Sequence, residues 1–202
     1  MGAYKLIEAI NFVLIRSNET PINSLSDDSS SASTLAKNFL ENERLAVLGE
    51  GLQFNTRISQ FNPNTNGNIL FGDNILSIDG SRKANNRSGN EDNKFAIVNS
   101  KLWDVEKQSD VFDDSVTLEV YYDIPFNEMP THIQYRIMTR TAVSFLSQFS
   151  ADESQLRDLV SMAQRARVEA DQKELNSDNT SMLTKSALGK LRHSRFFNRF
   201  RG

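Results

Sequence analysis

The sequence predicts an α+β protein: a helical bundle formed by the N- and C-terminal helices, an inserted small antiparallel β block, and an extended C-terminal tail. Three observations support this architecture. Apolar residues recur with a helical period near both ends of the chain, whereas they alternate with polar residues in the middle. Helical and strand segments are segregated rather than alternating, which is typical of α+β folds. The last segment mixes arginine with phenylalanine and has no clean period.

Two helices are expected before the change of period. The first, over 4–16, places apolar residues on one face. A Ser- and Asp-rich connection separates it from the second helix, over about 34–49, for which Ser33 is the expected N-cap. Gly49 and Gly51 are expected to end this helix. The apolar anchors of the two helices are Leu6, Ile10, Val13, Leu35, Phe39 and Leu40.

The middle of the chain carries the short strands of the β block. Residues 53–61 alternate apolar and polar side chains, which indicates a strand. The polar stretch 79–94 lacks apolar anchors and is expected to be a mobile loop. Residues 116–124 give the clearest strand signal, and Pro125 closes it. Further short strands are expected at 69–71 and 74–78, and a hairpin at 95–98 and 102–105.

The helical period returns after Pro130, which suits the first turn of a helix. Ser150 and Glu153 form a capping box for a fourth helix over about 151–175. The pattern then fails, so residues 176–187 are expected to be a linker. The expected inward-facing residues are Ile133, Ile137, Thr141, Phe145 and Phe149 in the third helix, and Leu156, Leu159, Val160, Ala163 and Ala166 in the fourth.

These elements divide the chain into three parts. Residues 1–52 and 129–176 are expected to form the helical bundle, 53–128 the inserted β-rich domain, and 177–202 the extended C-terminal docking tail. A chain of 202 residues buries roughly 70% of the surface that it would expose when unfolded. Its apolar fraction of 38% is low for a self-sufficient globule, which favours a protein that completes its burial against partners.

Cysteine and histidine content exclude several kinds of site. The chain has no cysteine, which removes disulfides, thiolate catalysis and thiolate zinc sites and is typical of a reducing compartment. His132 and His193 are too far apart in sequence for a local metal motif, so neither a metal nor another cofactor is expected. No apolar run approaches the roughly 18 residues of a membrane span, and no signal-peptide layout is present, so a soluble protein without a membrane partner is expected.

The search for catalytic residues finds no convincing set. Adjacent acids occur at 27–28, 91–92 and 113–114 in polar loops, where neighbouring carboxylates usually point apart. Glycosidases need two carboxyls that face each other across roughly 5–9 Å. His132 is expected to be a surface or capping residue, and Trp103 a sheet or interface anchor. Phosphate-binding loops and nucleophile elbows are absent from the sequence. We therefore expect no enzyme activity and no catalytic residue.

The C-terminal segment is the most unusual part of the sequence. Residues 185–202 hold six Lys or Arg and no acid, so a +6 tail follows a −9 body. A free tail would leave its three phenylalanines in water, whereas Arg and Phe are both enriched at interfaces. Docking to a protein is the favoured interpretation; a disordered solubilising end and nucleic-acid binding by Arg and stacked Phe are the alternatives. The candidate docking residues are Arg192, Arg195, Phe196, Phe197, Arg199, Phe200 and Arg201.

Short motifs along residues 4–183 occur in a characteristic order. They are Ala9-Ile10-Asn11, Ile22 to Leu25, Gly51 to Thr56, Asp73 to Asp79, Lys101 to Val105, Ile124-Pro125, Met129-Pro130, Arg136-Ile137, Arg140 to Ala142, Asp152 to Ala170, and Asp178 to Met182. With this order and spacing, the sequence resembles the tail tubular protein A family of short-tailed bacteriophages.

The resemblance implies a structural virion protein that is not defined by catalysis. Members of the family are adaptors that form a twelve-subunit ring between the portal vertex and the tubular nozzle. The expected partners are the portal protein, a nozzle resembling tail tubular protein B, tail fibres and further copies of the chain. Genomic DNA is expected to pass through the lumen without specific binding, because phosphate binding needs cations and the body is acidic.

The expected location is the virion tail, after assembly in the host cytoplasm. Two other functions compete with the adaptor hypothesis. One is a tail-associated polysaccharide hydrolase, which the missing pair of facing carboxylates opposes. The other is a nucleic-acid-binding module that uses the basic tail, for which salt-sensitive DNA binding by the isolated tail would be the signature.

Overall fold

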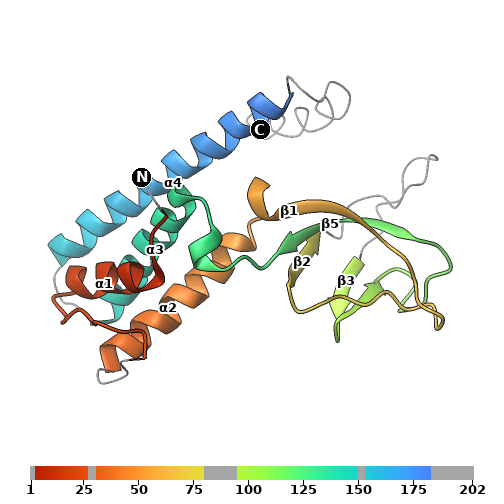
Figure 1. Ribbon diagram of the computed structural model, residues 1–202, viewed down its shortest axis with the longest axis horizontal. Coiled ribbons are helices and arrows are strands. Elements are labelled where there is room, and N and C mark those ends of the chain that lie inside the picture. The colour runs from red at the N-terminus through yellow and green to blue at the C-terminus, as the bar shows by residue number, and fades with distance from the viewer. Residues whose placement is uncertain (1–2, 27–30, 80–94, 150–152, 183–202) are drawn as a thin grey trace.

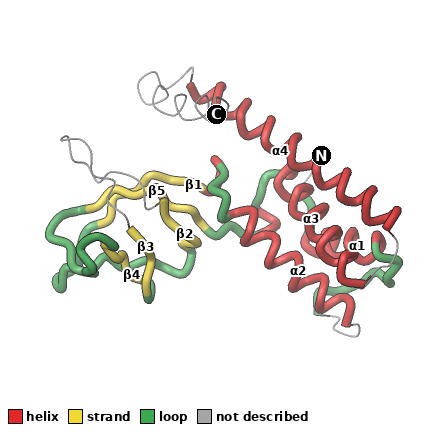
Figure 2. Tube along the Cα trace, turned by 180° about the vertical axis from the view of Figure 1, so that it is seen from behind, coloured by secondary structure: helices red, strands yellow, loops and turns green. Residues whose placement is uncertain are grey.

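The computed structural model describes residues 3–26, 31–79, 95–149 and 153–182. Helices gather at one end of an elongated body and strands at the other (Figures 1 and 2). The predicted α+β class is therefore confirmed. The helices are α1 (Leu6–Arg16), α2 (Ser31–Leu48), α3 (Thr131–Phe149) and α4 (Glu153–Met182), with short 3₁₀ turns η1 (Gln53–Asn55) and η2 (Phe126–Glu128). The strands are β1 (Thr56–Phe61), β2 (Ile75–Asp79), β3 (Phe95–Val98), β4 (Lys101–Asp104) and β5 (Val116–Tyr122).

Helix α3 is the centre of the bundle and packs against α1, α2 and α4. Its helical period buries Ile133, Ile137 and Phe145 as predicted. Thr141 is also buried, and its hydroxyl donates a hydrogen bond to the Ile137 carbonyl at 2.8 Å, which satisfies a polar atom inside the core. The side chain of Phe149 lies outside the described residues.

Helix α4 packs on α3 through a stripe of small and aliphatic residues. Leu159, Ala166 and Ala170 are buried along this stripe. Val160, which we expected to face inward, is 45% exposed, so that prediction is wrong. Successive helical residues are about 100° apart, and the stripe through Leu159 therefore leaves Val160 towards solvent.

Two predicted helix boundaries are wrong. Helix α2 begins at Ser31, so Ser33 lies inside the helix and is buried on the face that also holds Ala36, rather than capping the end. Helix α4 continues to Met182, where a linker was expected from residue 176. Residues 176–181 are all polar in sequence, so this stretch has no hydrophobic period, but it contains no Gly or Pro to stop a helix. The expected N-cap Ser150 lies outside the described residues.

The strands form two antiparallel sheets. One has the order β1–β5–β2, and the other is the hairpin β3–β4. The hairpin follows the prediction, with β4 starting one residue early. Asn99 and Ser100 have φ values of 52° and 59°, as a two-residue type I′ turn requires.

Other predicted strand segments differ in detail. The stretch that begins at Gln53 opens with the turn η1, and the strand starts only at Thr56. Residues 69–71 contribute one bridge, Leu70 to Lys101, rather than a strand. The loop predicted over 79–94 lies outside the described residues except for Asp79, which ends β2.

Each part of the body has its own cluster of buried apolar side chains. The helices share one cluster, and the strands share another that includes Leu102, Leu118 and Val120. Leu76 of β2 is an exception, because it packs against the helical cluster. The domain boundaries proposed from the sequence stay predictions.

Candidate interaction surfaces and the junction

The residues considered for chemistry do not converge in the structure. Among the described residues, no group of His, Cys, Asp and Glu could hold a metal ion. Asp113 and Asp114 are exposed in a bend before β5, and the acidic pairs at 27–28 and 91–92 lie outside the described residues. Trp103 stands in β4 opposite Ala96 of β3, which agrees with a role in the sheet. Within the described ranges, no helix is both long and apolar enough to span a bilayer.

His132 connects two helices. Its Nε2 atom lies 3.4 Å from Oε1 of Glu174, and both side chains are less than one-fifth exposed. Oε2 of the same carboxylate accepts a hydrogen bond from the Gln53 backbone N–H at 2.8 Å. Glu174 thus joins α4 to both α3 and the segment that leads into β1.

The seven candidate docking residues of the tail all lie outside the described residues. The chain reaches them from α4, whose solvent side exposes about half of Val168 and of Leu175. A shallow groove crosses this side of α4 and is lined by Gln164, Arg165, Val168, Glu169 and Gln172. Lys173 donates a hydrogen bond to Glu169 at 2.7 Å and lowers the pKa of that carboxyl.

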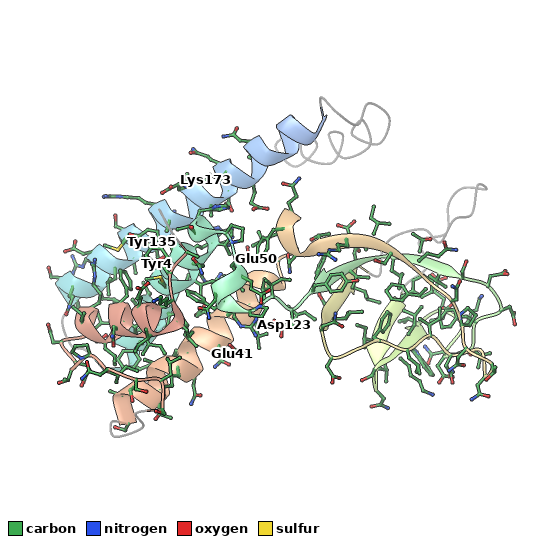
Figure 3. All side chains as sticks on the ribbon, viewed as in Figure 1. Tyr4, Glu41, Glu50, Asp123, Tyr135 and Lys173 are labelled. Atoms are coloured by element: carbon green, nitrogen blue, oxygen red, sulfur yellow. The ribbon has the colours of Figure 1, made fainter. Side chains whose placement is uncertain are left out.

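A buried polar site joins the helical bundle to the β block. Arg44, near the end of α2, is 8% exposed. Its Nε and Nη2 atoms donate to the two carboxylate oxygens of Glu41 at 2.8 and 2.5 Å. Nη1 donates to the Asp123 carboxylate, and to the Ile124 carbonyl at 2.7 Å. Figure 3 shows Glu41 and Asp123 approaching each other at this junction.

These contacts stabilise the charged form of Arg44. The hydrogen bonds to Glu41 contribute most to raising the pKa of the guanidinium, burial opposes them, and Asp123 adds to the increase. With Nη2 also 3.4 Å from the second oxygen of Asp123, all three guanidinium nitrogens have acceptors. Because the guanidinium is planar, buried and fully bonded, it holds the Glu41 and Asp123 carboxylates in one orientation relative to each other.

A buried amide makes a second link at the same place. Asn55 has no exposed surface, and its Nδ2 atom donates to the Leu48 carbonyl at 3.0 Å and to the Tyr122 carbonyl at 3.1 Å. The end of α2 and the end of β5 are thereby bonded to one side chain. Gly51, with φ of 72°, lies directly against the Tyr121 ring, since a Cβ atom there would be 2.6 Å from Cζ.

A charged network lies between α2, α3 and α4. Arg136 is fully buried, and its Nη2 atom donates to Glu50 while Nη1 lies 3.6 Å from Asp171. Arg140 donates to Glu43 at 2.8 Å and to Glu50 at 3.0 Å. Arg136 is incompletely bonded, because its Nε and Nη1 atoms have no hydrogen-bond partner among the described residues.

Arg44, Asn55 and Glu174 are not among the residues that the sequence predicts to be important. Arg44 and Asp123 are 79 positions apart, and Gln53 and Glu174 are 121 apart, so no local pattern connects them. One available signal was an arginine on the otherwise apolar face of α2, four residues after Leu40 and three before Val47.

The described residues thus form a helical bundle and a β block that are joined by buried polar contacts. Comparison with known proteins identifies the class of protein. The sequence model of the tail tubular protein family matches residues 7–182, which include both the helical bundle and the β block, and the chain belongs to this family of structural phage-tail proteins. It is also 25% identical to tail tubular protein A of Klebsiella phage KP34 over 149 residues, or 73% of this chain and 75% of that protein.

Proposed function

We propose that the protein is a non-catalytic head-to-tail adaptor, which forms a ring of twelve copies between the portal and the tail nozzle. The supporting observation is a family match that extends over both parts of the body, so both belong to one tail component. The helical bundle and the β block present separate surfaces at opposite ends of the subunit (Figure 1). Two such ends can contact two different partners, the portal and a nozzle resembling tail tubular protein B, and tail fibres are a further candidate partner.

In this proposal the ring is assembled in the host cytoplasm and the genome leaves through its lumen. The −9 body favours passage of DNA without binding, because counterion release requires cations at the phosphates. The free chain is expected to be monomeric or weakly associated, with ring formation templated by the portal. Electron microscopy of the protein mixed with its portal tests this. A ring on the portal face is the expected result, and a single bound copy or attachment elsewhere on the virion would contradict it.

Within this function, the arginines and phenylalanines of the C-terminal tail dock onto the portal. They are Arg192, Arg195, Phe196, Phe197, Arg199, Phe200 and Arg201. Helix α4 extends to Met182, and the remaining 20 residues therefore start from the end of a 30-residue helix rather than from the bundle core. Each phenylalanine contributes on the order of 1.5–3 kcal/mol on burial. Ordering costs about 1–2 kcal/mol per residue, so the arginines must also find acceptors and several copies must bind together.

A chain that ends at Met182 tests the docking role. It should retain the helical circular dichroism of the full chain, because both apolar clusters lie before this point. It should nevertheless dissociate from portal-bearing heads. A full-length control with its three tail phenylalanines changed to leucine keeps the charge and most of the apolar area, and should stay attached. Equal attachment and DNA retention by the truncated chain would overturn the docking role.

A further inference from the structure

Two chain segments connect the helical bundle to the β block, residues 49–55 and 123–130. A paired connection that contains Gly49 and Gly51 would be a natural place for bending, because glycine tolerates many backbone conformations. The observed packing removes that freedom. Gly51 is pressed against the Tyr121 ring, where any larger side chain would collide.

Polar contacts tie both connecting segments to the bundle. Arg44 of α2 holds the Asp123 carboxylate and the Ile124 carbonyl in the second segment. The Asp123 backbone N–H in turn donates to the Asn74 carbonyl just before β2, at 2.9 Å, so the residue that Arg44 holds is itself bonded into the β block. A turn of the β block relative to the bundle would therefore break the arginine fork.

Further contacts oppose the same motion from other directions. Asn55 joins the ends of α2 and β5, and Glu174 of α4 accepts from the Gln53 backbone in the first segment. Leu76 of β2 packs against the apolar cluster of the helices. These contacts together tie the β block and its connecting segments to α2, to α4 and to the apolar cluster of the helices.

We propose that Arg44 and Asn55 are positioning residues that hold the β block at one fixed angle to the helical bundle. The junction between the two parts of the subunit is then rigid. Its role in assembly rests on the proposed function, in which the angle would set the spacing between the two partner surfaces. These contacts favour a fixed junction over a flexible one, because the buried Arg44 guanidinium is fully hydrogen-bonded. The Arg136 guanidinium inside the bundle is buried too, but two of its nitrogens have no hydrogen-bond partner among the described residues.

The natural chain has no cysteine, so two introduced cysteines can carry spin labels at chosen positions. Ser161 on α4 and Glu106 after β4 are exposed, and Ser161→Cys with Glu106→Cys reports the distance between the two parts. The otherwise unchanged full-length chain should give one narrow distance distribution. Arg44→Met and Asn55→Ala should each broaden it at least two-fold. Arg44→Lys, which keeps the charge but loses the fork, should give an intermediate width.

Arg157→Met is the control, because the Arg157 guanidinium donates to Glu153 of the same helix, α4, at 2.8 Å. It should leave the width unchanged even where it lowers the unfolding midpoint. If Arg44→Met does not fold, Asp123→Ala removes the contact between Arg44 and the Asp123 carboxylate, at a position whose side chain is one-third exposed. Distributions as narrow as the control in folded Asn55→Ala and either of these variants would overturn the proposal. The isolated chain is measured, so failure to form a ring would contradict only the proposed function.

Discussion

At the scale of single residues, two buried arginines differ in how completely their guanidinium groups are hydrogen-bonded. Arg44 has acceptors at every guanidinium nitrogen, whereas Nε and Nη1 of Arg136 have no hydrogen-bond partner among the described residues. Taking a charge out of water is costly unless hydrogen bonds compensate for it. The two side chains should therefore respond differently to replacement by an apolar residue.

Replacing Arg136 should cost little. In Arg136→Met the apolar stem is kept, and Glu50 retains the hydrogen bond from Arg140 at 3.0 Å. The free energy of unfolding should change by less than about 1 kcal/mol, because the lost ion pairs are offset by relief of desolvation. Arg44→Met, measured beside it by urea denaturation, should cost about 2–3 kcal/mol. A loss in Arg136→Met as large as that in Arg44→Met would contradict this view of the network.

One surface carboxylate offers a direct electrostatic test. The Lys101 ammonium donates to Asp110 at 3.0 Å and lowers the pKa of that carboxyl below its ordinary 3.8. Because the folded-state pKa is depressed, the contribution of the pair to stability is present above the unfolded value and is lost as pH falls through the folded one. An NMR titration should place the Asp110 midpoint below 3.8.

The same titration can identify the cause. Lys101→Met should move the Asp110 midpoint back towards its ordinary value. Lys107→Met is the control, because Lys107 lies 3.9 Å from a different carboxylate, Asp104, and should leave the midpoint of Asp110 in place. An Asp110 midpoint that is unchanged in Lys101→Met would show that the ion pair is not formed in solution.

At the scale of elements, α4 depends on close contact with α3. Its buried stripe includes Ala166 and Ala170, which bring the two backbones near each other. Ala166→Leu should lower the free energy of unfolding by about 1–3 kcal/mol, because the added methyl groups have no space between the helices. Val160→Leu on the exposed side is the control and should stay within about 0.5 kcal/mol of the parent. Equal effects in urea denaturation would mean that α4 is not seated as described.

At the scale of the whole molecule, two apolar clusters imply two units that can lose structure separately. The single tryptophan, Trp103, lies in the β block, while the helical circular dichroism comes from the bundle. The two signals therefore report on different parts of the same chain. A core substitution in one part should shift the unfolding transition reported by that part's signal more than the other transition. This holds unless the junction makes the two parts unfold together.

Leu118→Ala tests this separation. Leu118 is fully buried in the β cluster, and its truncation should cost about 2–5 kcal/mol. The Trp103 fluorescence transition should move to lower urea than the helical transition. Ile137→Ala in the bundle is the matched change and should move the helical transition more than that of Trp103. Superimposed transitions in both variants would show that the junction makes the body one cooperative unit.

Local patterns in the sequence were sufficient to predict the fold class and most of the elements. The helical spacing of Ile133, Ile137 and Phe145 predicted α3 and its buried face, and the alternation after Val116 predicted β5. These predictions succeed because they depend on local periodicity, which follows from burying one side of a helix or strand. The family motifs, read in order, also predicted the phage-tail class that the comparisons confirm.

The end of α4 and the way in which the two parts are joined could be seen only in the folded molecule. Residues 176–181 are all polar in sequence, so periodicity could not predict that the helix reaches Met182. The links from Arg44 to Asp123, and from Asn55 to both Leu48 and Tyr122, depend on segments that meet only after the chain has folded. Sequence spacing does not predict which distant segments come into contact, because distant side chains become neighbours through the packing of whole elements.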